Sequence, residues 1–239
     1  MLFCGAMKIF AHRGARKEAP ENTLLAFQKA LELGVDGIEF DILLTKDKVP
    51  VVTHNNDLSI LTSYKGLLHQ TPFSAIRDLN LGEGQIIPTL TEVLELVKIY
   101  PKAHAVLELK AQSGLAMDAA KLIGGLAQDI LPPERFTLSS FSLSYLKAMK
   151  KHHSKLRRAW IVSRPPFTLV PFSFFDTFLE LGAIHPCVSI TSDRLVQKAH
   201  REGWEVLAWT VNDSKDWQKV SNLRVDGIFT DDPRWAMTL

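Results

Sequence analysis

Two carboxylates occupy alternate positions within one apolar run of the sequence. Glu39 and Asp41 stand in the segment GIEFDILL, where the two-residue period of a β-strand places both on one face and the apolar residues on the other. Buried like charges are costly unless a cation or a shared proton offsets them. The pair therefore indicates a bound cation or a shared proton, and a salt bridge to Lys or Arg at a barrel end is the structural alternative.

A third carboxylate repeats this pattern. Glu108 lies in the apolar segment AVLELK, with Lys110 two residues further on. If the two strands end at the same face of a sheet, three carboxylates can converge there. Ligation by oxygen alone is typical of Ca²⁺ or Mg²⁺ and argues against zinc, because no cysteine lies nearby. Mn²⁺ also fits if a histidine joins the ligands.

Two histidines end further apolar segments near the acidic strand. His12 follows KIFA and precedes Arg13, and His54 follows PVVT. Because imidazole titrates near neutral pH, the pair could act as general acid and base, while Arg13 and Lys110 bind an anionic group such as phosphate. The other histidines have no comparable setting and are interpreted as surface or packing residues: His69, His104, His152, His153, His185 and His200.

Short β-branched or apolar runs that alternate with amphipathic segments must position these side chains. Such alternation predicts parallel strands joined by helices. The predicted strands are Lys8 to Ala11, Gly37 to Leu43, Ala103 to Lys110, Arg135 to Ser139, Leu156 to Val162, Ala183 to His185, Glu205 to Thr210 and Gly227 to Thr230. Eight strands in 239 residues favour a TIM (β/α)8 barrel as one α/β domain over residues 1–239, whose active site would lie at the carboxyl ends of the strands.

The connection after the second strand is unusually long, from about Thr45 to Leu90. Within it, Val49 to Thr53 could extend a strand or form a hairpin with Ile42 to Leu44, and Ser74 to Leu79 could be a short helix. We therefore predict an elaborated loop over one barrel mouth without domain status. Ahead of the second strand, Asn22 or Thr23 is expected to cap a helix that begins at Leu24.

Composition excludes several classes of protein. The chain is 46% hydrophobic and 23% charged, as expected of a soluble globular protein, and its formal net charge of +2 comes from scattered basic residues, which argues against nucleic-acid binding. Cys4 and Cys187 are too few for a disulfide scaffold. No apolar run is long enough to span a membrane, and MLFCGAMKIF is too short for a signal peptide. These features predict a cytoplasmic protein without a stable membrane anchor.

The segment AHRGARKEAPENTLLAFQKALELGVDGIEFDILLTKDKVPVVTH resembles the opening of the glycerophosphodiester phosphodiesterase family, most closely its cytoplasmic bacterial type. The family pattern is HRG, then PENT, then ExD, then VxxHD. The match continues through IPTLTEVLEL, the LELK strand, SSF, AWTVN and DGIFTDDP, so it covers nearly the whole chain.

This resemblance implies a metal-dependent barrel that hydrolyses deacylated phospholipids, which are small molecules, to glycerol 3-phosphate and an alcohol. It implies Glu39, Asp41 and Glu108 as ligands of a divalent metal ion. It also implies His12 and His54 as catalytic residues, Arg13 and Lys110 at the phosphate, and Trp209 in the pocket wall. Which histidine is the acid and which the base stays open.

Two departures from the family pattern keep alternatives open. Asn55 stands where the family usually has Asp after the histidine, and residues 59–62 replace an RTT-like stretch. Both changes could lower activity or shift substrate preference, and a catalytically silent phosphodiester-binding protein is one alternative. Another is a related phospholipase-type barrel lyase acting on intact lipid through an apolar rim at Pro165 to Phe178, a stretch that also reads as a barrel helix with its entry loop.

Overall fold

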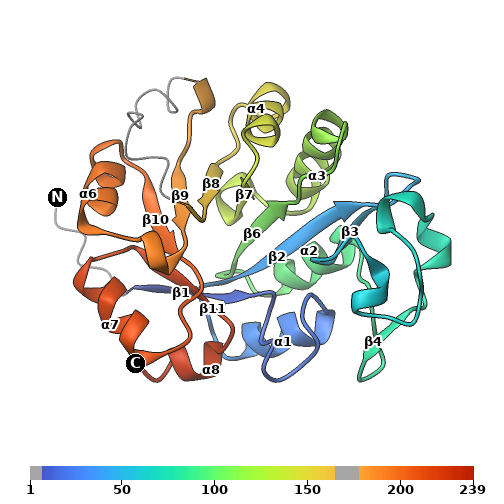
Figure 1. The fold of residues 1–239 in the computed structure, drawn as a ribbon, viewed down its shortest axis with the longest axis horizontal. Helices are drawn as coiled ribbons and strands as arrows, with labels where there is room; N and C mark the ends of the chain where they lie inside the picture. Colours follow the sequence, from blue (N-terminus) through green and yellow to red (C-terminus); the bar gives the residue numbers. More distant parts are fainter. Residues whose placement is uncertain (1–6, 165–177) are drawn as a thin grey trace.

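The computed structural model describes residues 7–164 and 178–239 of the chain. Eight parallel strands pair in a closed ring, β1 with β2, then β6, β7, β8, β9, β10 and β11, which returns to β1 (Figure 1). Their bounds are β1 Lys8–His12, β2 Gly37–Leu44, β6 His104–Leu109, β7 Phe136–Ser140, β8 Arg158–Val162, β9 Ala183–Pro186, β10 Glu205–Ala208 and β11 Gly227–Thr230. Each predicted strand is present within a few residues, and the predicted (β/α)8 barrel is confirmed.

Helices surround the ring and cover its outer face (Figure 1). They are α1 Leu24–Glu32, α2 Leu90–Ile99, α3 Ala116–Ile130, α4 Leu143–His152, α6 Asp193–Arg201, α7 Ser214–Asn222 and α8 Pro233–Ala236. Of the two residues predicted to cap α1, Thr23 does so, because its side chain accepts a hydrogen bond from the backbone N–H of Ala26. Asn22 has another partner, described below.

Strand alternation divides the apolar residues into two layers. Ile38, Phe40 and Ile42 of β2 belong to the large apolar cluster between strands and helices. A separate cluster joins side chains of β1, β6, β10 and β11, which can meet only through the barrel interior: Phe10, Val106, Leu207 and Phe229. This inner cluster forms an apolar floor, and the alternate residues of β2, including Glu39, face the space above it.

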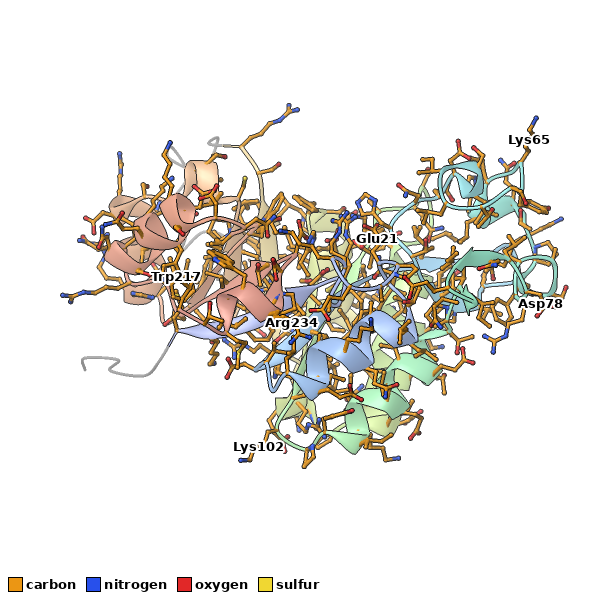
Figure 2. All side chains as sticks on the ribbon, turned by 90° about the horizontal axis from the view of Figure 1, so that it is seen from below. Glu21, Lys65, Asp78, Lys102, Trp217 and Arg234 are labelled. Carbon is orange, nitrogen blue, oxygen red and sulfur yellow. The ribbon has the colours of Figure 1, made fainter. Side chains whose placement is uncertain are left out.

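The long connection after β2 forms an insertion with a small core of its own. β3, Pro50–Val52, runs antiparallel to β2 and pairs Ile42 with Val52, as predicted. Three 3₁₀ turns and a short hairpin follow: η1 Leu58–Ile60, η2 Leu68–Gln70, η3 Phe73–Ala75, β4 Asn80–Gly82 and β5 Gln85–Ile86. The core consists of Leu43, Val51, Leu58, Leu68, Ile76 and Ile87. In Figure 2, Lys65 and Asp78 mark the part of the insertion that projects beyond the barrel.

One prediction for this insertion is corrected. The segment from Ser74 to Leu79 was expected to form a short helix, but only the single turn η3 forms there. The side chain of Ile76 is buried in the small core, and the chain is extended again from Asn80, where β4 begins. These two constraints leave no room for a longer helix.

The apolar stretch from Pro165 to Phe178 lies outside the described residues except for Phe178. The structure therefore tests neither the rim nor the helix predicted for it. Within residues 7–164 and 178–239, no helix has both the length and the apolar composition that crossing a membrane requires.

Candidate active site

A cavity of about 320 Å³ opens at the carboxyl ends of the barrel strands. One side is charged and is lined by His12, Arg13, Glu39, His54, Glu108 and Lys110. The other side is mostly aromatic and apolar and is lined by Ser139, Phe141, Ile161, His185, Trp209, Thr210 and Phe229. Seven of the eight residues singled out from the sequence thus line one cavity, and the eighth, Asp41, lies buried beside Arg13 and Lys110.

The turn after β1 brings Arg13 over the acidic strand. Arg13 and Gly14 both have positive φ, 60° and 83°, which for Arg13 is a strained conformation. A Cβ at position 14 would lie 2.7 Å from the backbone carbon of Ala26, so glycine is required there for space as well as for φ. The backbone N–H of Arg13 donates to the carbonyl of Glu39 at 2.9 Å. These constraints tie Arg13 to β2.

Asn22 holds the next part of this loop against β2. Its side chain is buried, its Nδ2 donates to Asp41 Oδ2 at 2.9 Å, and its Oδ1 accepts from the backbone N–H of Asp41 at 3.3 Å. Asn22 therefore orients Asp41 and does not cap a helix. The sequence contained a signal for this residue in the PENT motif, but its partner lies 19 residues away and could not be read from local spacing.

Glu39, Asp41 and Glu108 converge as predicted. All three are buried, and one oxygen of each lies within 4.8 Å of the others. Burial and repulsion from the other two carboxylates raise the pKa of Glu39 well above its ordinary value. Burial and the charge of Asp41 raise the pKa of Glu108 to about 7. Burial would also raise the pKa of Asp41, but the charges of Lys110 and Arg13 outweigh this effect and hold it below its ordinary value.

Two cations face these three carboxylates. Lys110 Nζ lies 3.3 Å from Asp41 Oδ1 and 2.8 Å from Glu108 Oε1, and Arg13 Nε lies 3.1 Å from Asp41 Oδ2. Burial, together with repulsion among the carboxylates, still raises the pKa of Glu39 and Glu108 despite these contacts. The cluster therefore fits a further positive charge, and its all-oxygen donor set fits a hard divalent cation.

We expect the stability of the metal-free protein to fall as pH rises through the range set by Glu108. Its pKa is about 7 in the folded chain and 4.5 ordinarily, so between these values the folded state binds more protons than the unfolded state. The free energy of unfolding then falls with rising pH, by on the order of 2 kcal/mol.

Urea unfolding between pH 4.5 and 8, with a chelator present, measures this dependence. Glu108→Gln should flatten the curve, whereas Glu95→Gln on the exposed face of α2 serves as the matched control and should follow the wild type. Parallel curves for the wild type and Glu108→Gln would contradict the assignment of this titration.

His12 is paired with a carboxylate that sequence reasoning did not single out. Its Nδ1 donates to Asp231 Oδ1 at 2.7 Å, and its Nε2 lies 4.0 Å from Glu39 Oε2. Asn212 donates to Asp231 Oδ2 and accepts from the backbone N–H of Asp231, at 2.7 and 2.8 Å. Burial opposes ionisation of Asp231, but the hydrogen bond and charge of His12, together with Arg16, lower its pKa to about 2. An ionised carboxylate thus orients His12.

His54 has a neutral partner instead. Its Nδ1 lies 3.1 Å from Asn55 Oδ1, so Nδ1 carries the proton and Nε2 keeps its lone pair. Burial lowers the pKa of His54, and the charges of Lys110 and Arg13 lower it further against the opposing effect of Asp41. The two histidines therefore differ: one is held by a carboxylate, the other by an amide.

Trp209 lines the aromatic side, where it contacts two neighbours. Its Nε1 donates to the backbone carbonyl of His185 at 2.8 Å. Its ring packs edge-to-face against Phe141, with the ring centroids 5.6 Å apart. Lys110 Nζ lies 5.9 Å above the ring of Phe141. His185, interpreted from the sequence only as a surface or packing residue, is buried but also lines the cavity. Its position at the end of the predicted strand Ala183 to His185 was a signal for this placement, because active sites of barrels lie at the carboxyl ends of the strands.

Comparisons with known proteins point to one family. Residues 12–234 match the glycerophosphoryl diester phosphodiesterase family. A glycerophosphodiester phosphodiesterase of Caldanaerobacter subterraneus subsp. tengcongensis is 32% identical over 241 residues, which cover 97% of this chain and 96% of that protein. One from Bacillus altitudinis is 31% identical and covers 97% of each chain. The structure of an Oleispira antarctica phosphodiesterase in complex with the product sn-glycerol-3-phosphate has a TM-score of 0.89 and 28% identity, and covers 97% of this chain and 95% of that one.

Proposed function

The chain belongs to the glycerophosphoryl diester phosphodiesterase family, and we propose that the cavity at the strand ends is its active site. The protein is a phosphoric diester hydrolase that converts glycerophosphodiesters to glycerol 3-phosphate and an alcohol. The observation that carries the site assignment is the meeting of three buried carboxylates, two cations and two histidines around one cavity.

Glu39, Asp41 and Glu108 hold a divalent cation in this proposal, with Ca²⁺ or Mg²⁺ favoured by the oxygen donors and Mn²⁺ compatible with them. Such a cation offsets the negative charge of the phosphodiester oxygens. Arg13 and Lys110 bind the same phosphate, since both line the cavity beside the carboxylates. Trp209 supports the alcohol or glycerol portion through its apolar ring.

The different partners of the histidines support the following assignment of acid and base in this proposal. His54, with a lowered pKa and a free Nε2, takes the proton of the nucleophile, which is water or the glycerol hydroxyl next to the phosphate. The oxygen of the nucleophile bonds to phosphorus as the bond between phosphorus and the alcohol oxygen breaks. His12, which the carboxylate of Asp231 orients, gives its proton to the alcohol oxygen. The alcohol leaves neutral. Where the glycerol hydroxyl attacks, water then opens the resulting cyclic phosphate to give glycerol 3-phosphate.

We expect Asp231→Asn to lower kcat on glycerophosphocholine by about 10- to 100-fold, a typical cost for losing the carboxylate partner of a histidine. Asp232→Asn is the matched control, because Asp232 contacts Lys17 and caps α8 outside the cavity. Equal losses in the two variants would contradict a specific role for Asp231.

The reaction itself is tested with two substrates. Purified protein is incubated with glycerophosphocholine or intact phosphatidylcholine, with and without added divalent cation, and glycerol 3-phosphate, choline and cyclic phosphates are quantified. Hydrolysis of glycerophosphocholine to glycerol 3-phosphate is expected. Turnover confined to intact lipid would favour the phospholipase-type lyase, and binding without turnover would favour a silent phosphodiester-binding protein.

The remaining parts of the proposal concern domain and location. We propose one barrel domain over residues 1–239 that acts in the cytoplasm on a small-molecule substrate, without nucleic acid and without a stable membrane anchor. Its support is the family match over residues 12–234 and the nearly balanced charge of the chain. Fractionation of cells followed by immunoblotting tests the location.

A further inference from the structure

His185 is a buried histidine on the cavity wall that the acid–base chemistry above does not use. Only 2% of its surface is exposed, yet its side chain lines the cavity. Its Nε2 has no hydrogen-bond partner among residues 7–164 and 178–239. Buried polar side-chain atoms nearly always have a partner. The partner of this nitrogen is therefore to be sought in a molecule that enters the cavity.

The barrel fixes His185 opposite the charged cluster. β9, which carries His185, is four strands from β2 in either direction around the ring. The imidazole packs against the ring of Phe229, with centroids 5.0 Å apart. The indole of Trp209 holds the backbone carbonyl of His185 at 2.8 Å. His185 thus faces the carboxylates and cations across the cavity, next to the apolar floor that includes Phe229.

The chemistry of this position suits an uncharged polar group. Burial, together with the charges of Arg157 and His104, lowers the pKa of His185 to about 3, so the ring is neutral near pH 7. A neutral imidazole offers one donor and one acceptor, which matches a hydroxyl group. The phosphate has its cationic partners, Arg13 and Lys110, on the other side of the cavity.

The substrate carries such a hydroxyl at a suitable place. When the phosphodiester is bound by the charged side, the hydroxyl on the carbon next to the phosphoester stays near the phosphate, and the terminal glycerol hydroxyl extends further. Every substrate of this class contains glycerol, whereas the esterified alcohol varies. The buried side of the cavity at His185 therefore suits the glycerol moiety, which does not vary. We propose that His185 hydrogen-bonds the terminal hydroxyl of the glycerol moiety and selects substrates that have it, an inference that rests on the proposed function.

A substrate that lacks only this hydroxyl tests the proposal. kcat/KM is measured for glycerophosphocholine and for the 1-phosphocholine ester of propane-1,2-diol, which keeps the hydroxyl next to the phosphoester. The wild type should prefer glycerophosphocholine by about 10- to 100-fold, the effect of one hydrogen bond to a buried group. In His185→Leu this preference should fall towards 1. His185→Asn, which keeps a donor and an acceptor, should recover part of it.

His104→Leu is the matched control. His104 is also a histidine of the barrel with a lowered pKa, but its Nε2 bonds Thr137 Oγ1 at 2.9 Å and it is not among the cavity-lining residues. This variant should keep the wild-type preference, and circular dichroism establishes that each variant is folded. Equal kcat/KM of the wild type for the two substrates would overturn the proposal without any variant. A folded His185→Leu that loses activity equally on both would also overturn it, whereas a wild type that hydrolyses neither would instead refute the proposed function.

Discussion

Removal of divalent cations is expected to lower the hydrolysis of glycerophosphocholine by about 10³-fold or more, because several kcal/mol of charge stabilisation is lost. The physical reason lies in Glu39 and Glu108, whose pKa values are raised by burial and by repulsion from neighbouring carboxylates, which Arg13 and Lys110 do not fully offset. Activity is measured after dialysis against a chelator, and again after separate addition of Ca²⁺, Mg²⁺ or Mn²⁺. At least one of these ions should restore turnover.

Substitution of two of the three carboxylates tests whether they bind the cation. Glu39→Gln and Asp41→Asn should both weaken metal binding in titration calorimetry. Glu39→Gln relieves repulsion in the metal-free protein, whereas Asp41→Asn removes a charge that Lys110 and Arg13 stabilise, so circular dichroism first establishes that each variant is folded. Asp118→Asn is a suitable control because Asp118 forms an exposed ion pair with Lys48 away from the cavity. Full activity in protein shown by elemental analysis to be free of metal would exclude a catalytic metal. Unchanged affinity in both variants would exclude these ligands.

The barrel could be predicted from the sequence because its signals are local. Each strand is a short buried run, and in β2 the alternation of apolar and acidic residues shows which side chains face the interior. The same alternation identified Glu39 and Asp41 as neighbours on one face. Closure of the ring then brought Glu108 to them, because β2 and β6 pair with Asp41 beside Glu108.

The residues that sequence reasoning missed act through contacts between distant segments. Asp231 meets His12 across 219 positions of the chain, and Asn22 meets Asp41 across 19 positions. The cavity-facing position of His185 depends on packing against Phe229 from β11. Local propensity contains none of this information. The turn η3 was missed for a related reason, since the small core of the insertion outweighs local helix preference there.

His54→Ala is expected to lower turnover by roughly 10²- to 10⁴-fold, the usual contribution of a positioned general base. Among residues 7–164 and 178–239, the other histidines that line the cavity are His12, which Asp231 already holds, and His185, which lies on the aromatic side. kcat and KM are measured on glycerophosphocholine and glycerophosphoethanolamine after circular dichroism has shown the variant to be folded. Turnover near that of the wild type would remove His54 from the mechanism.

Asn55→Asp then tests why an amide stands beside this base. A carboxylate next to His54 favours its protonated form and should raise its pKa, which burial, Lys110 and Arg13 now hold low. Because the base must be unprotonated, the acid limb of the pH profile should move to higher pH by about 1 unit, while activity on the plateau stays intact or rises. Asn56→Asp is the matched control. It adds the same charge one residue further on, where the side chain contacts His69. If Asn55→Asp caused a large loss on the plateau while Asn56→Asp did not, the site would have to be tuned to a neutral partner, and the asparagine would itself be part of how this enzyme sets its base.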